Sequence, residues 1–504
     1  MISNVFYPPK KTKFLMILGT ASHVGKSILV TALCRIFAKE GYKVAPFKSQ
    51  NMSLNSWVTK DGKEIGIAQA IQAHAAGIEP TADMNPVLLK PKGNKLSQVI
   101  ILGKPYADKS AGDYYESINP IFEAVQGALE RLSDIYDIIV MEGAGGAAEI
   151  NLYSRDIANL GVARLTKAPI ILVGDIEKGG VFASLYGTLE LLPSDIKKQV
   201  KGLVINKFRG DLDILKPGLQ QIEDLTGIPV LGVLPYTDLK IPSEDSVSII
   251  DKNLTHSHET GNKPISIAII RLPRISNFTD FEILESYANI RYVNLKDDLG
   301  NPDAIIIPGT KNTVRDLKEL KKTGMDKKIL EFAKKDIPII GICGGYQILG
   351  KEIIDIGIED KGIEVVKGLC LLDITTVFDK YQKQTKQVEK KVTGTGEIFD
   401  NIHGETIKGY EIHMGKTKIL QGNTLFEDDG CLNANGLIFG TYLHGLFNNK
   451  NIRDAFLGYL YSRVGLEYKS ANNNYNDECM IYDNLAKFVK ENLDIGKIYN
   501  LLKF

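Results

Sequence analysis

Residues 14–37 read FLMILGTASHVGKSILVTALCRIF, and this stretch decides the fold of the first half of the chain. An apolar run leads into a loop that starts at Gly19 and ends in Gly25-Lys26-Ser27, and helical periodicity follows. A strand, a glycine loop and a helix in this order are typical of a P-loop, here with five residues between the glycines instead of the usual four. A chance Gly-Lys-Ser is the alternative, but its place between strand and helix favours a nucleotide site.

Backbone and side-chain groups of this loop are expected to bind ATP, through Gly19, Thr20, Gly25, Lys26 and Ser27. Lys26 would reach the β- and γ-phosphates, and Ser27 would bind Mg²⁺. The metal needs a second ligand at the end of another strand, for which Glu142 is our first choice and Asp175 our second. Asn206, also at a strand end, is expected to contact the base, with a structural role in the turn as the alternative.

Short apolar runs alternate with helical periodicity along the whole chain. In the first half they are residues 14–18, 136–142, 168–175, 201–208 and 228–235, and in the second half 265–273, 302–310, 337–345 and 435–445. Runs that are apolar on both faces indicate buried parallel strands joined by crossover helices. The fold class is therefore α/β, with a parallel-sheet P-loop domain followed by a second α/β domain.

The domain boundaries follow from this reading. We predict a P-loop domain over 1–250, a linker over 251–263, a second domain over 264–455 and a helical tail over 456–504 packed on the second domain. The basic segment 378–397 is expected to be an exposed hairpin or loop. His256 and His258 in the linker have no further ligands nearby, so we expect them to be solvated rather than metal-bound.

The composition excludes several classes of protein. The 504 residues include 61 Lys and Arg and 61 Asp and Glu, so no net charge favours nucleic acid or an anionic membrane. The five cysteines show no CxxC spacing, which argues against a disulfide framework and a zinc site. No apolar stretch reaches membrane-spanning length and the N-terminus does not resemble a signal peptide, so a cytoplasmic location is expected. The oligomeric state is left open.

A second motif stands at residues 337–350, IPIIGICGGYQILG. It places Cys343 on a glycine-flanked turn between a strand and a helix, where the helix N-terminus activates a thiol. The backbone N–H groups of Gly344 and Gly309 are expected to form an oxyanion hole. A buried structural cysteine is the alternative, but this order of elements favours a nucleophile.

The base that would serve Cys343 is His444, which follows an apolar strand. His403 and His413 are the competing histidines. A carbonyl-attacking cysteine and an ATP site in one chain suggest a shared reaction. We expect ammonia to be released from glutamine at the first site and consumed at an ATP-activated carboxylate at the second.

Each motif resembles a known family. The P-loop spacing with the EGAGG partner at 142–146 resembles the dethiobiotin synthetase branch of P-loop proteins, and Ala21 stands where partitioning ATPases carry a lysine. The cysteine constellation resembles the class I glutamine amidotransferases. Their usual His-x-Glu is not present, because Leu446 occupies the third position. Which residue, if any, orients His444 is therefore open.

Together the two halves resemble the cobyrinate and cobyrate amidases of cobalamin biosynthesis. The segments that carry this likeness are 47–56, 64–73, 84–91, 142–161, 174–188 and 409–415. The resemblance implies ATP, Mg²⁺ and L-glutamine as requirements. It also implies amidation of the b, d, e and g carboxylates of adenosylcobyrinic acid a,c-diamide through a phosphorylated carboxylate.

Polar residues that could hold such an acceptor are Lys48, Gln50, Asn51 and Asp156, with helix capping as the alternative role of Asp156. Three other functions compete. One is synthesis of the a,c-diamide, and another is amidation of a cell-wall lipid precursor. The third is a P-loop switch protein with a non-catalytic amidotransferase domain.

Overall fold

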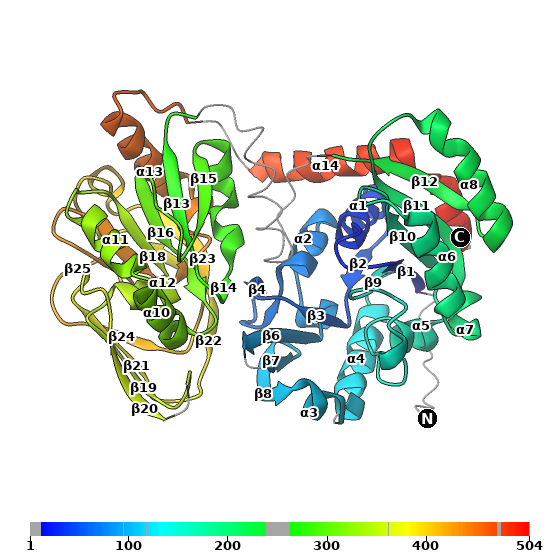
Figure 1. Ribbon diagram of the computed structural model, residues 1–504, viewed down its shortest axis with the longest axis horizontal. Helices are drawn as coiled ribbons and strands as arrows, with labels where there is room; N and C mark the ends of the chain where they lie inside the picture. Colours follow the sequence, from blue (N-terminus) through cyan, green and yellow to red (C-terminus); the bar gives the residue numbers. More distant parts are fainter. Residues whose placement is uncertain are drawn as a thin grey trace.

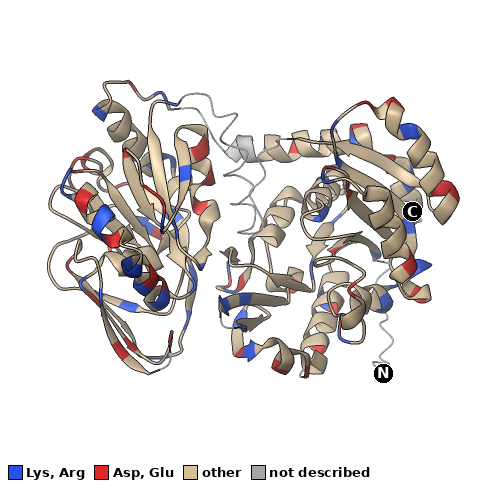
Figure 2. Cartoon of the chain, in the orientation of Figure 1, with Lys and Arg blue, Asp and Glu red and all other residues tan. Residues whose placement is uncertain are grey.

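The computed structural model describes residues 12–93, 95–116, 118–237, 263–360, 362–470 and 475–502 (Figure 1). Two α/β domains stand side by side, each built around its own sheet. Apart from Lys263, the predicted linker lies outside the described residues, as do His256 and His258. Acidic and basic residues are mixed over both domains (Figure 2). Among the described residues, no helix is long and apolar enough to cross a membrane.

The first domain is built on a six-stranded sheet in which all neighbouring strands are parallel. Its order is β12 (Val230–Pro235), β11 (Val200–Phe208), β10 (Ile170–Asp175), β1 (Lys13–Gly19), β9 (Ile138–Glu142) and β2 (Val44–Phe47). The five predicted runs all form strands of this sheet, and β2 is an addition. The loops after β1, β9, β10 and β11 meet at one edge, as parallel pairing requires.

Helices cover both faces of this sheet. They are α1 (Lys26–Lys39), α2 (Ile67–Ala75), α3 (Ala111–Glu116), α4 (Ile118–Ser133), α5 (Leu160–Thr166), α6 (Val181–Leu191), α7 (Ser194–Lys197) and α8 (Leu212–Thr226). Side chains that alternate along β1 divide between two apolar clusters, with Met16 on one face and Ile17 on the other. This two-sided burial explains why the strand is apolar throughout.

A smaller sheet projects from the first domain toward the second (Figure 1). Its order is β3 (Gln50–Met52), β6 (Val87–Gly93), β7 (Leu96–Ile101) and β8 (Lys104–Ser110), and the pair β4 (Ser56–Val58) and β5 (Glu64–Gly66) lies beside it. These strands are short or polar, so hydrophobic periodicity did not predict them. They supply most of the first domain's contacts with the second.

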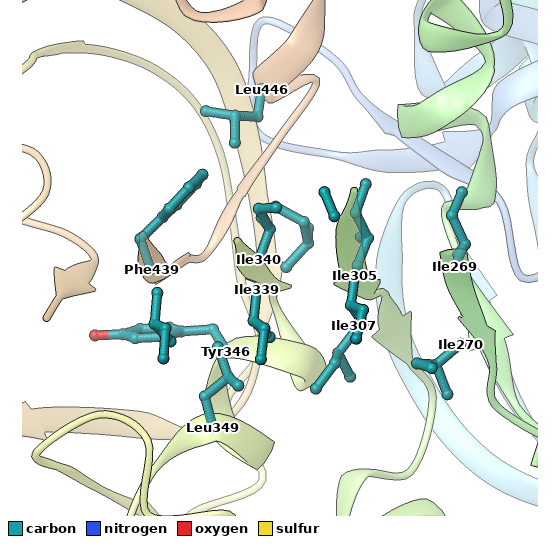
Figure 3. Packing of buried hydrophobic residues seen from close by; sticks show 14 of the residues in the cluster. Ile269, Ile270, Ile305, Ile307, Ile339, Ile340, Tyr346, Leu349, Phe439 and Leu446 are labelled. Atoms are coloured by element: carbon teal, nitrogen blue, oxygen red, sulfur yellow. The ribbon is translucent and has the colours of Figure 1, made fainter. Parts of the chain in front are cut away.

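The second domain has a seven-stranded sheet. Its order is β15 (Asn289–Asn294), β13 (Ser266–Arg271), β16 (Ala304–Ile307), β18 (Ile339–Ile342), β27 (Ile438–Thr441), β26 (Cys431–Leu432) and β25 (Asn423–Thr424). The first five strands are parallel, and the last two are antiparallel additions. Figure 3 shows isoleucines of β13, β16 and β18 side by side across the sheet, with Tyr346 and Leu349 near those of β18.

The other elements of this domain surround that sheet. The helices are η3 (Phe278–Ser286), α10 (Thr313–Lys322), α11 (Met325–Ala333), α12 (Gly344–Leu349) and α13 (Lys450–Arg463). Short strands β14 (Ile275–Ser276) and β17 (Gly309–Thr310) pair with each other. A separate sheet joins β19 (Glu352–Ile356), β20 (Ile363–Lys367), β21 (Ile374–Phe378) and β24 (Lys416–Ile419), and another joins β22 (Gln384–Lys391), β23 (Thr406–His413) and β28 (Leu443–His444).

The helical tail corrects the sequence prediction. Helix α13 packs on the second domain, but α14 (Tyr475–Asn492) and α15 (Ile495–Leu502) pack on the first, against α1 and β12 (Figure 1). Leu485 and Val489 join the apolar cluster of α1, and Asp483 accepts from Arg35 at 2.7 Å. An amphipathic pattern shows that one face is buried, but not which surface covers it.

The segment 378–397, expected to be an exposed hairpin or loop, contains a strand that also contacts the first domain. Strand β22 forms an eight-residue antiparallel ladder with β23. Thr385 donates to the carbonyl of Gly62 at 2.6 Å, and Gln387 donates to that of Val58 at 2.8 Å. These polar side chains bind the backbone of the first domain, so their polarity reflects an interface rather than solvent.

Two asparagines connect the domains next to the cysteine motif. The Asn277 side chain accepts from the N–H of Ser56 at 3.1 Å, and that of Asn55 accepts from the N–H of Phe278 at 3.2 Å. Both asparagines are buried. Buried polar groups with reciprocal partners fix the relative position of two surfaces, because separation would leave them unsatisfied.

Candidate functional site

The P-loop takes the conformation that its glycines permit. Gly25 has φ +100°, and a Cβ there would lie 2.0 Å from the Asn206 amide nitrogen. The Asn206 amide donates to the carbonyl of Val24 at 2.8 Å, so it supports the loop from the next strand but one. This contact agrees with the structural role that was the alternative for Asn206. Binding of the nucleotide base by Asn206 stays a prediction.

Lys26 stands at the start of α1 with its side chain directed across the loop. Its ammonium donates to the carbonyls of Ala21 at 2.9 Å and Gly145 at 2.8 Å. Gly145 belongs to the glycine-rich turn that follows Glu142. The lysine therefore lies between the two loops that the sequence assigned to the phosphates, Gly19 to Gly25 and the EGAGG turn.

Glu142 is the centre of the polar network behind this loop. It is 2% exposed, and its carboxylate accepts from Ser27 at 2.8 Å, from Lys48 at 2.9 Å and from Gln72 at 2.6 Å. The structure thus brings together the two predicted metal ligands, Ser27 and Glu142. Asp175 instead pairs with Lys207 at 2.8 Å. Glu142, our first choice, is thus the acid in hydrogen-bond contact with Ser27.

The residues around Glu142 fit a hydrated Mg²⁺. A hydroxyl and a carboxylate oxygen are hard ligands of the kind Mg²⁺ takes beside nucleotide phosphates. Gln72 adds an amide oxygen that is buried without a hydrogen-bond partner among the described residues. A buried acceptor of this kind suits a water bound to the metal.

Each of the predicted acceptor-binding residues has hydrogen-bond partners within the first domain. Gln50 accepts from the Tyr114 hydroxyl at 2.6 Å, and Asn51 donates to Gln69 at 3.2 Å. The Asp156 carboxylate accepts from the N–H groups of Ala158 and Asn159, both at 2.7 Å. Asp156 thus stabilises the turn that precedes α5, whose N-cap is Asn159, and Lys48 pairs with Glu142.

Cys343 sits on a strained turn between β18 and α12. Its φ is +52° and its ψ is −107°, which a residue with a side chain rarely adopts. The thiol lies 3.3 Å from the carbonyl oxygen of Ile412, and the residue is 8% exposed. Such a turn lifts the sulfur above the sheet edge, beside the N-terminus of α12.

His444 is held by a carboxylate that the sequence did not indicate. Its Nδ1 lies 2.7 Å from Oδ2 of Asp280, and the other oxygen of Asp280 accepts from the N–H of Gly445 at 3.0 Å. Burial lowers the pKa of His444, but the charge and hydrogen bond of Asp280 and the contact with Cys343 raise it to about 10. Asp280 is a positioning residue, since it acts on the thiol through His444.

The two competing histidines lie elsewhere. His403 is exposed on the surface. His413 stacks on Tyr442 with ring centroids 3.7 Å apart, and its Nδ1 lies 2.9 Å from the carbonyl of Gly415. His413 lines the same cavity as Cys343, but His444 is the histidine in hydrogen-bond contact with the thiol.

The two glycines proposed for the oxyanion hole lie close to the cysteine and histidine. Gly344 begins α12, and a Cβ on it would lie 3.1 Å from the backbone nitrogen of Thr310. A Cβ on Gly309 would lie 3.4 Å from Cε1 of His444. Gly309 of β17 and Gly344 therefore lie beside the turn that carries Cys343. Because neither has a side chain, a substrate oxygen can approach their backbone N–H groups.

A small cavity opens beside Cys343. Its lining includes His444, Thr310, Lys311, Glu359 and Lys383 of the second domain and Lys90 of the first. The first domain therefore contributes to the wall of the cysteine site.

We predict that Asp280→Asn lowers the maximal rate of glutamine hydrolysis by about 100- to 10,000-fold, because asparagine can neither stabilise an imidazolium nor enforce the tautomer. The alkaline limb of the pH profile, set by loss of the imidazolium proton, is expected near pH 10 in the native protein. It should move to lower pH in the variant, since burial then acts without the carboxylate. A pH profile measured on the folded variant tests this. A large rate loss with an unmoved alkaline limb would contradict it.

This fold and site define a class: a nucleotide-binding α/β domain joined to an amidotransferase-type α/β domain. Comparison with known families agrees. Residues 15–249 match the CobQ/CobB/MinD/ParA nucleotide binding domain, and residues 266–452 match the CobB/CobQ-like glutamine amidotransferase domain. The predicted fold class is confirmed.

Relatives of nearly full length specify the family. A probable cobyric acid synthase of Methanosarcina barkeri is 65% identical over 491 residues, covering 97% of this chain and 99% of that protein. Those of Methanosarcina mazei and Methanococcoides burtonii are each 63% identical and cover 97% of this chain, and 99% and 97% of their own lengths. The chain belongs to the cobyric acid synthase family of cobalamin biosynthesis, which confirms the resemblance seen in the sequence.

Proposed function

We propose that this protein converts adenosylcobyrinic acid a,c-diamide into adenosylcobyric acid by amidating the b, d, e and g carboxylates, at the expense of ATP and glutamine. One observation carries the proposal. The cysteine site and the P-loop lie in two domains that meet at the cysteine cavity, whose wall includes Lys90 of the first domain and Cys343 of the second.

The P-loop domain would activate the acceptor. A carboxylate resists attack by ammonia because it is negatively charged and would have to expel oxide. Transfer of the γ-phosphoryl group of ATP to a carboxylate oxygen removes both obstacles and releases ADP. Lys26 would stabilise the charge on the phosphoryl oxygens, and Ser27 and Glu142 would hold the Mg²⁺, which supplies further charge neutralisation when bound.

The cysteine domain would supply ammonia. The Cys343 sulfur attacks the side-chain amide carbon of glutamine, and the oxyanion is stabilised by the N–H groups of Gly344 and Gly309. His444 gives a proton to the leaving nitrogen, so that ammonia and a thioester form. Water then hydrolyses the thioester to glutamate, with His444 as its base. Ammonia attacks the acyl phosphate, the amide forms and phosphate leaves.

Mass spectrometry of the corrinoid tests the proposed function. Adenosylcobyrinic acid a,c-diamide, incubated with protein, Mg-ATP and glutamine, should gain four successive replacements of OH by NH₂. Omitting ATP should abolish every replacement. An unchanged corrinoid with folded protein would refute this substrate, and amidation of the undiamidated precursor would instead identify a synthase of the a,c-diamide.

A further inference from the structure

A cluster of three buried lysines borders the cysteine cavity, and the steps above do not use it. Lys90 lies on β6 of the first domain, Lys311 follows β17, and Lys383 precedes β22. All three line the cavity that contains Cys343 and His444. The side chains of Lys90 and Lys383 are 4% and 5% exposed, and Lys311 is 9% exposed. Bulk water therefore screens these charges poorly.

The cluster has fewer carboxylates than ammonium groups. Lys90 and Lys383 both pair with Glu64, whose side chain has no exposed surface, and Lys90 does so at 2.7 Å. Lys311 donates instead to the side-chain oxygen of Gln98 at 2.8 Å, which is a neutral acceptor. Burial of an ammonium group whose hydrogen-bond acceptor is neutral is costly, so this arrangement favours an anion in the cavity.

The surroundings of Lys311 disfavour its charged form, and a bound anion would favour that form again. Burial lowers the pKa of Lys311 well below the usual value, and the charges of Lys383 and Lys90 lower it further. Glu359 lines the same cavity, where burial raises its pKa to about 7 although the charge of Lys311 opposes the rise. Its carboxylate accepts from the N–H groups of Thr313 and Val314 at the start of α10. The cavity wall thus presents a cation and an acid together.

We infer that this cluster binds the α-carboxylate of glutamine, with Lys311 as the principal ligand and with the first domain completing the pocket through Lys90 and Gln98. The inference rests on the proposed function. A carboxylate of the corrinoid is the other source of the same chemistry. Glutamine is favoured because the cavity also holds Cys343 and His444, which act on its amide.

The acid on the same wall strengthens the choice of glutamine. An amino acid carries an ammonium group one carbon from its carboxylate, so a site for it needs an acceptor as well as a cation. Glu359 offers that acceptor beside Lys311. A corrinoid carboxylate has no such ammonium group.

The position of these residues has a consequence for coupling. Lys311 belongs to the second domain, but its hydrogen-bond acceptor Gln98 lies on β7 of the first. Lys383 likewise pairs with Glu64 of β5. The carboxylate subsite is therefore assembled only when the two domains are in contact, and glutamine affinity then depends on that contact.

Inactivation by 6-diazo-5-oxo-L-norleucine tests the inference without corrinoid or ATP. This glutamine analogue keeps the α-carboxylate and α-amino group and alkylates the active-site thiol. In Lys311→Met, the concentration for half-maximal inactivation should rise about 10- to 100-fold, the effect of losing one buried charged hydrogen bond. Iodoacetamide, which has no carboxylate, should show a much smaller change. Lys311→Arg should recover most of the affinity, and Lys318→Met, on the surface of α10, is the matched control.

The outcomes separate the two hypotheses. If the analogue inactivates the native protein saturably and its concentration for half-maximal inactivation is unchanged in Lys311→Met, the carboxylate site is refuted but the glutaminase function is not. A higher Michaelis constant for the corrinoid in the ammonium-dependent reaction, with analogue binding unchanged, assigns the lysine to the acceptor and also overturns the carboxylate site. No inactivation of the native protein would instead refute the glutaminase function. Lys311→Gln, which keeps a partner for Gln98, replaces the methionine variant if that one does not fold.

Discussion

Cys343→Ala should abolish glutamine-dependent amidation while amidation with free ammonium continues. We expect a loss of at least about 1,000-fold with glutamine, because no other thiol among the described residues lies beside His444 and Asp280. Ammonia added directly bypasses the thioester and needs only the activated carboxylate. Both rates are measured by mass spectrometry of the corrinoid at saturating ATP.

The variant is well suited to the purpose, because alanine keeps the Cβ. The strain of φ +52° at this turn is therefore the same before and after the substitution. Cys431→Ala is a matched control, since that thiol is buried in the same domain away from the cavity. If the folded Cys343 variant lost both nitrogen sources, the division of labour between the domains would be wrong.

The fold was predictable where burial dictates composition. The predicted runs of the P-loop sheet are apolar on both faces, and each one forms a strand. Strand β2 was missed because VAPF is short and contains proline, and β15 because NIRYVN alternates polar with apolar residues. The small sheet that bears Lys90 is polar because it meets the other domain. Hydrophobic patterns predict which residues form a core, but they do not predict a polar interface between domains.

The sequence predicted which residues of the cysteine site lie close together only where they belong to recognisable motifs. Cys343 and Gly344 are adjacent in sequence. Gly309 follows β16 and His444 follows β27, the two strands that flank β18 and its cysteine turn. Asp280 precedes His444 by 164 residues and lies in a short helix without a recognisable motif. Asp280 contacts His444 as the Glu of the usual His-x-Glu motif would, although Leu446 stands at the position of that Glu. The missing His-x-Glu therefore gives no support to a non-catalytic domain.

The C-terminal helices α14 and α15 are a second case in which the sequence did not show which surfaces are in contact. Their amphipathic pattern predicted a packed helix correctly, but the pattern has no information about the partner surface. The structure places Asp483 against Arg35 and Lys490 against Glu40, so charges on α1 and α14 match. The C-terminal helices thus return to the first domain, which is formed by segments of the chain that precede and follow the second domain.

Lys26→Ala should remove amidation with both glutamine and ammonium, by about 100- to 1,000-fold or more, because no acceptor would be phosphorylated. The ammonium of Lys26 bridges the Ala21 and Gly145 carbonyls at 2.9 and 2.8 Å, so it stands between both loops that would surround the phosphates. Lys39→Met, at the exposed end of the same helix, is the matched control. Alkylation of Cys343 by the glutamine analogue should persist in Lys26→Ala, since that step needs no nucleotide. Retained ammonium-dependent amidation in the folded variant would refute the P-loop assignment, whereas loss of analogue binding would show that the P-loop itself controls the cysteine site.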